Sequence, residues 1–153
     1  MNTNDILRRI RYVFDFKDTS VIEIFALGGC IIDKDSLLSI LKKEDDEGYQ
    51  ECSYDQLEQF LDGLIIYRRG KKENGPPVPK VLLSNNVILK KLRIALEFKE
   101  NDMISIFKLA DFPLSKPEIS ALFRRKGHSN FKKCGDQILR NFLNGLTKRY
   151  RDK

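Results

Sequence analysis

The segment Phe60-Leu-Asp-Gly-Leu64 recurs 82 residues later as Phe142-Leu-Asn-Gly-Leu146. Extending this comparison outward aligns residues 4–68 with residues 86–150 without a gap, and 17 of the 65 pairs are identical. Self-similarity at a fixed shift indicates that one structural unit is present twice. The chain of 153 residues is therefore expected to divide into two small units.

The two copies are separated by a stretch that breaks regular structure. Residues 70–79 read GKKENGPPVP, which places two glycines and three prolines among charged side chains. Such a composition interrupts helices and stays in water. We predict a first repeat over residues 1–69, a linker over residues 70–82 and a second repeat over residues 83–153.

Within each copy the apolar residues follow helical spacing. On the first helix they recur at intervals of three and four, which places on one face Ile6, Leu7, Ile10, Val13 and Phe14. No segment shows the sustained alternation of a strand. We therefore predict an all-α protein of two tandem four-helix repeats. Because a unit of about 68 residues buries only about 60 % of its unfolded surface, the repeats are expected to pack into one compact, pseudo-twofold protein.

Capping signals mark the ends of the second helix. Asp18 or Ser20 is expected to begin it, because Ser20 and Glu23 have the spacing of a capping box. Gly28 and Gly29 are expected to supply a left-handed stop, which commonly ends a helix.

Further signals recur at equivalent positions of both copies. Asp33 and Ser115 are expected to begin the third helix of their repeats. Ser53, three residues before a glutamine, has the capping-box spacing for the fourth helix. Gly63 and Gly145 fall inside the fourth helices, where glycine costs about 1 kcal/mol of helix propensity, and they therefore predict a close crossing with another helix.

The two halves of the chain differ in the sign of their charge. The chain carries 28 Lys and Arg against 22 Asp and Glu, a formal net charge of +6. Residues 1–75 hold 11 basic and 15 acidic side chains, a net charge of −4, whereas residues 76–153 hold 17 and 7, a net charge of +10. This excess of positive charge favours a polyanionic partner for the second repeat.

Several function classes lack their sequence signatures. The uncharged stretch Ile24–Ile32 is far shorter than the about 18 apolar residues that cross a bilayer. Residues 1–11 have no apolar core of a secretory signal, so we expect a cytoplasmic protein without a membrane partner. The single histidine, His128, has no catalytic partner near it in the sequence, and no glycine motif for nucleotides is present. Cys52 and Cys134 are expected to be buried thiols, because no CxxC spacing indicates a zinc site. We therefore expect no catalysis, no cofactor and no metal.

Basic clusters supply the candidate binding residues. The first helix of each repeat carries three cations at equivalent positions, and the segment FRRKGHSNFKK at residues 123–133 interleaves basic side chains with two phenylalanines. Cations on an exposed helix or loop can contact successive phosphates, and each neutralised phosphate adds salt-sensitive affinity. The predicted nucleic-acid-binding residues are Arg8, Arg9, Arg11, Lys90, Lys91, Arg93, Arg124, Arg125, Lys126, Lys132 and Lys133. An ordinary solvated charged face is the alternative interpretation.

The segment from Asp102 to Lys126 also has the proportions of a helix-turn-helix, with a short turn at Asp111–Leu114. In such a motif the second helix enters the major groove of DNA. Together with the basic clusters, the segment favours a non-catalytic DNA-binding protein that acts through its second repeat.

The loop before the fourth helix reverses its charge between the repeats. Glu44-Asp-Asp-Glu47 occupies the positions of Lys126-Gly-His-Ser129. Complementary potentials orient association, so the two loops could meet within one chain, or head-to-tail between chains, and either loop could meet a partner. A protein-interaction or self-assembly module is therefore the alternative function.

Several segments resemble the YehS-like family of small two-repeat bacterial proteins. The resemblance is carried in the first repeat by NDILRRIR at residues 4–11, IEIFALGG at 22–29 and FLDGLIIY at 60–67, and in the second by LKKLR at 89–93, ALFRR at 121–125 and CGDQ at 134–137. It covers the chain except for the linker. It implies a two-repeat bacterial cytoplasmic protein, and it implies no activity and no catalytic residue.

Overall fold

The computed structural model describes residues 1–70 and 82–151, and within these ranges it contains eight α-helices and no strand. The helices of the first repeat are α1 at Thr3–Phe14, α2 at Asp18–Leu27, α3 at Lys34–Leu41 and α4 at Tyr54–Arg69. The helices of the second repeat are α5 at Asn85–Leu96, α6 at Glu100–Leu109, α7 at Lys116–Leu122 and α8 at Asp136–Tyr150. The predicted all-α fold of two four-helix repeats is confirmed. Apart from Gly70 and Leu82, the predicted linker lies outside the described residues.

The third and fourth helices begin where their capping residues indicate. The Asp33 side chain accepts a hydrogen bond from the Ser36 amide at 2.8 Å, and Ser53 accepts one from the Gln56 amide at 3.0 Å. Ser115 likewise caps α7. Each cap satisfies an amide at the helix start that has no partner inside the helix, so local sequence alone fixes these boundaries.

The start of α2 differs from the prediction. Lys17 is the N-cap residue and its side chain makes no capping hydrogen bond, so neither Asp18 nor Ser20 caps the helix. Asp18 instead stands in the first turn, where it pairs with Arg11 at 2.7 Å. A carboxylate in that turn is also stabilised by the positive end of the helix dipole. The ion pair and the dipole therefore take the place of a side-chain cap.

Two glycines allow α2 and α4 to cross in backbone contact. A Cβ atom on Gly63 would lie 1.8 Å from the Ile24 carbonyl oxygen, and one on Gly28 would lie 1.7 Å from the Gln59 carbonyl oxygen. The predicted close crossing at Gly63 is confirmed. The left-handed stop predicted at Gly28 and Gly29 is present, and the left-handed residue is Gly29, with a φ of +92°, whereas Gly28 has a φ of −86°. Gly28 is needed for space, not for a turn.

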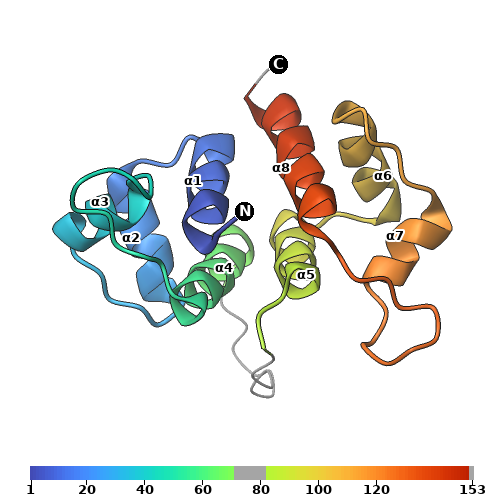
Figure 1. The fold of residues 1–153 in the computed structure, drawn as a ribbon, viewed down its shortest axis with the longest axis horizontal. Coiled ribbons are helices and arrows are strands. Elements are labelled where there is room, and N and C mark those ends of the chain that lie inside the picture. Colours follow the sequence, from blue (N-terminus) through green and yellow to red (C-terminus); the bar gives the residue numbers. More distant parts are fainter. Residues whose placement is uncertain (71–81, 152–153) are drawn as a thin grey trace.

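The two repeats pack against each other as the halves of a symmetric dimer would. Helix α1 packs against α8 and α4 packs against α5, so that these four helices meet at the centre of the molecule (Figure 1). A shift of 82 residues converts α1 into α5 and α4 into α8. The two contacts are therefore one contact made twice around a pseudo-twofold axis. One apolar core cluster includes buried residues from both repeats.

Polar contacts between the repeats obey the same shift. Arg9 of α1 donates a hydrogen bond to Asn144 of α8, and Lys91 of α5 forms an ion pair with Asp62 of α4. Residues 9 and 91 are equivalent, and so are residues 62 and 144. Each repeat therefore supplies one cation to a partner on the fourth helix of the other.

A half-buried asparagine positions the loop between α7 and α8. Asn86 on α5 donates to the carbonyls of Leu122 at 2.9 Å and Lys132 at 3.0 Å, and it accepts a hydrogen bond from the Cys134 amide at 2.9 Å. Three bonds from one side chain join α5 to the end of α7 and to the last part of the loop. The basic α7–α8 loop is therefore held beside α5.

Candidate nucleic-acid interface

The cations of α1 are engaged within the fold. Arg8 pairs with Asp5 on its own helix, and Arg11 pairs with Asp18 at the start of α2. Arg9 reaches α8 across the contact between the repeats. Each of these three predicted phosphate contacts already has a partner inside the protein.

The cations of α5 differ from one another in their surroundings. Lys91 lies in the contact between the repeats. Arg93 donates from Nε to the Phe98 carbonyl at 3.1 Å, and its guanidinium carbon lies 4.6 Å from the centre of the Phe123 ring. Lys90 is exposed and has no ion pair among the described residues. The equivalent of Asp5 on this helix is Val87, so no carboxylate neutralises Lys90 from the preceding turn.

The α7–α8 loop presents the other exposed cations. Lys132 pairs with Glu118 at 3.6 Å, so it is not one of the unpaired cations of this loop. The predicted cations of this loop that are exposed and make no ion pair within residues 1–70 and 82–151 are Arg124, Arg125, Lys126 and Lys133. Together with Lys90 we call these five side chains the second-repeat cations.

The equivalent loop of the first repeat, between α3 and α4, is acidic and lies far from the α7–α8 loop. Glu44–Glu47 lies beside α3, at the opposite end of the long axis from the α7–α8 loop (Figure 1). The two loops therefore do not meet within one chain, which corrects one of the arrangements derived from their charges. At the positions of Arg124 and Arg125 the first repeat retains Lys42 and Lys43.

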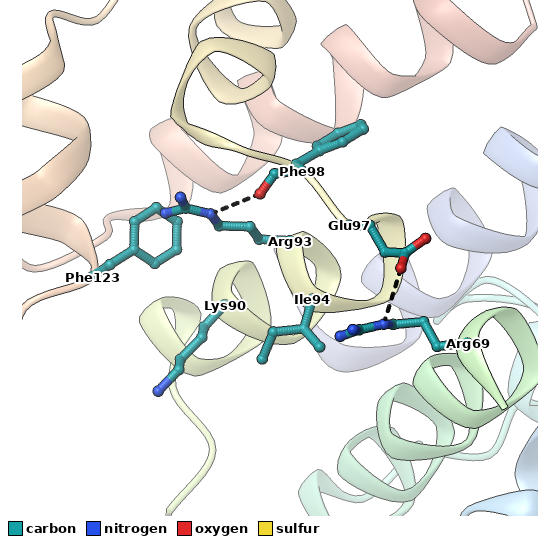
Figure 2. A pocket seen from close by; sticks show the side chains of 7 residues that line it. All are labelled: Arg69, Lys90, Arg93, Ile94, Glu97, Phe98 and Phe123. Atoms are coloured by element: carbon teal, nitrogen blue, oxygen red, sulfur yellow. Dashed lines mark hydrogen bonds and ion pairs between the residues drawn. The ribbon is translucent and has the colours of Figure 1, made fainter. Parts of the chain in front are cut away.

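An open pocket of about 400 Å³ lies beside α5 (Figure 2). Arg69 reaches it from the end of α4, whereas Lys90, Arg93 and Ile94 line it from α5, and Phe123 closes it from the end of α7. Three cations, the carboxylate of Glu97 and several apolar side chains thus share one concave surface. Lys90 and Arg93 are among the residues predicted from the sequence, whereas Arg69 and Ile94 are not.

Arg69 belongs to a second pair of contacts that obeys the repeat shift. It pairs with Glu97 at 3.4 Å, and its equivalent Arg151 pairs with Asp15 at 2.8 Å. The pair of opposite charges at positions 69 and 97 therefore recurs at the equivalent positions 151 and 15. That pattern is visible in the sequence, and it is the signal that could have located Arg69.

Two cysteines are buried, whereas the histidine lies in an exposed loop. Burial raises the pKa of Cys52 and of Cys134 to about 12, so both thiols are protonated at neutral pH. The His128 ring accepts a hydrogen bond from the Asn130 amide at 3.0 Å in an exposed loop. Within the described ranges, no three His, Cys, Asp or Glu side chains gather in a way that could hold a metal ion.

Helices α6 and α7 pack against each other as a helix-turn-helix reading of this segment requires. Helix α7 is however only seven residues long. Its cation, Lys116, stands in the first turn, and its acidic residue, Glu118, is the capping-box partner of Ser115. The cations near α7 lie mainly in the loop that follows it.

A membrane-spanning helix is not found in the described part of the chain.

The paired four-helix units define the chain as a two-repeat helical protein, and comparison with known proteins gives its family. A family model described as "Protein of unknown function (DUF1456)" matches twice, at residues 3–70 and at residues 85–152. The chain is also 43 % identical over 150 residues to a protein of Escherichia coli (strain K12) described as "Uncharacterized protein YehS", over 97 % of this chain and 96 % of that protein. The chain therefore belongs to this two-repeat family, as its resemblance predicts. No solved structure matches it.

Proposed function

We propose that the protein binds nucleic acid, and duplex DNA in particular, through the second-repeat cations. The observation that carries this proposal is an asymmetry between equivalent positions. Lys90 has no ion pair among the described residues, whereas its counterpart Arg8 is paired with Asp5. Lys126 and Lys133 are likewise exposed cations, where the first repeat has glutamates at positions 44 and 51. Positions 126 and 133 thus carry a charge opposite to that of their counterparts in the first repeat.

The arrangement of the loop supports contacts with successive phosphates. The Asn86 hydrogen bonds hold the α7–α8 loop beside α5, so the loop cations and Lys90 belong to neighbouring elements. Unpaired cations are available to displace the counterions that surround DNA, and this release supplies sequence-independent affinity. We place the contacts on the loop because α7 itself offers Lys116 as its cation. Arg9 and Lys91 are not part of this surface, since they join the repeats.

The first prediction concerns the salt dependence of this binding. Arg124→Ala combined with Arg125→Ala is expected to weaken binding to a mixed-sequence duplex and to reduce the slope of log affinity against log salt by about 0.9 per lost phosphate contact. Fluorescence anisotropy titrations at several salt concentrations measure both quantities. Lys42→Ala combined with Lys43→Ala is the matched control, because it removes two cations from the equivalent positions of the first repeat.

Equal losses of DNA affinity in the two double variants would contradict the proposal, and so would an affinity that does not change with salt.

The same variants test head-to-tail self-association, which the placement of opposite charges at the two ends of the long axis favours. Sedimentation velocity that shows an oligomer lost in the Arg124 and Arg125 variant, without a change in DNA affinity, would support that second function instead.

A further inference from the structure

We infer that the pocket beside α5 receives one unpaired nucleotide. This inference rests on the proposed function and extends it, because it gives the nucleic-acid surface a site for a single base. The duplex contacts proposed above share Lys90 with the pocket, but they do not involve Arg93 or Phe123. The two ideas can therefore fail separately.

Arg93 provides a rigid platform for the base. Its Nε atom is held by the Phe98 carbonyl at 3.1 Å, and its guanidinium carbon lies 4.6 Å from the centre of the Phe123 ring (Figure 2). The hydrogen bond and the ring together hold the guanidinium group, so little side-chain freedom remains to be lost on binding. Unstacked bases pack on arginine planes as they do on aromatic rings. The base is expected to continue the stack that Phe123 and Arg93 begin.

Two of the remaining lining residues suit the other parts of a nucleotide, whereas Glu97 is held in its ion pair with Arg69. Ile94 adds apolar surface next to Arg93, whereas Lys90 stands one turn earlier on the same face of α5. Lys90 is exposed, so its ammonium group can turn toward a phosphate, whereas Arg69, which lines the pocket from α4, is already paired with Glu97. A pocket of about 400 Å³ lies within the range of known small-molecule sites. A planar base joined to a negatively charged phosphate matches this combination of a stacking surface and a cation.

The first repeat has different side chains at the equivalent place. Tyr12 stands at the position of Ile94, and the Arg151 guanidinium carbon lies 4.4 Å from the centre of its ring. Arg8, the counterpart of Lys90, is paired with Asp5. Leu41 replaces Phe123, so no aromatic ring supports Arg11 there. The inference therefore assigns one nucleotide site to each chain, in the second repeat.

The test compares three probes of equal length: a single-stranded oligothymidylate, an abasic sugar-phosphate strand and a duplex. The wild-type protein is expected to bind the base-bearing strand about tenfold more tightly than the abasic strand. Arg93→Lys keeps the charge but loses the planar group, and Phe123→Leu copies the first repeat. Each variant is expected to lower the affinity for the base-bearing strand to that of the abasic strand, and to leave duplex affinity unchanged. Arg11→Lys, at the equivalent position of the first repeat, is the control.

The outcomes separate the two ideas. Equal wild-type affinity for base-bearing and abasic strands would overturn the nucleotide site while leaving duplex binding intact. Failure of every probe to bind would instead overturn the proposed function. Circular dichroism of each variant shows whether it is folded, and because the two variants alter different side chains, an unfolded Arg93→Lys protein still leaves the Phe123→Leu result.

Discussion

Replacing Asn4 with leucine is expected to lower the free energy of unfolding by about 3 kcal/mol or more. The Asn4 side chain is 0 % exposed and donates to the carbonyls of Ile40 at 2.8 Å and Gln50 at 2.9 Å. It also accepts a hydrogen bond from the Cys52 amide at 2.9 Å. Leucine has a similar volume but cannot form any of these bonds. Three backbone groups then lose their partner, and each costs about 1–3 kcal/mol when it is left buried and unpaired.

Urea-induced unfolding followed by circular dichroism measures this loss. Asn86→Leu removes the same three bonds from the second repeat and is expected to be destabilising as well, although less so because Asn86 is only half-buried. Asn101→Ala is the control, since Asn101 is exposed on α6 and is expected to change stability by about 0.5 kcal/mol or less. If the Asn4→Leu protein unfolded at the same urea concentration as the wild type, these bonds would not stabilise the segment between α3 and α4.

A single added methyl group at Gly63 or Gly145 is expected to cost at least about 2 kcal/mol of stability. The Cβ atom of alanine at Gly145 would lie 2.2 Å from the Ile106 carbonyl oxygen, and at Gly63 it would lie 1.8 Å from the Ile24 carbonyl oxygen. Both clashes involve helix backbone, which cannot rotate away as a side chain can. The helices must separate, and the packing lost in doing so exceeds the about 1 kcal/mol that alanine gains in helix propensity.

Thermal and chemical unfolding of the two alanine variants measure the effect. Gly135→Ala provides a control within the same chain, because no atom lies within 4 Å of its added Cβ atom and its φ is −76°. That variant is expected to change stability by less than about 1 kcal/mol. If Gly63→Ala were instead more stable than the wild type, helix propensity alone would govern the site and the close crossing would play no part.

The repeat made much of the fold predictable, because a constraint that acts within one repeat leaves its mark twice. Ser53 and Asp33 cap their helices through bonds to residues three positions away, so local sequence is sufficient. Gly63 stands where glycine is costly, and its recurrence at position 145 indicated a close crossing. The start of α2 was not predictable in this way, because Asp18 is drawn to Arg11 on another helix.

The candidate site was less predictable than the fold, since its side chains depend on packing between helices. Sequence treats Arg9 and Lys91 as ordinary exposed cations, but the contact between the repeats places each of them against the fourth helix of the other repeat. Arg69 reaches the pocket only because α4 packs on α5. The hydrophobic periodicity of one helix cannot specify which other helix it meets, and so it cannot specify these partners.

The second repeat alone is expected to carry the nucleic-acid surface. Titration of the isotope-labelled protein with a short DNA duplex, followed by amide chemical shifts in NMR spectra, tests it most directly. We expect shifts concentrated in residues 124–133 and around Lys90, with residues 42–51 unchanged. Shifts of equal size in residues 42–51, or no shift at Arg124–Lys133, would contradict the account.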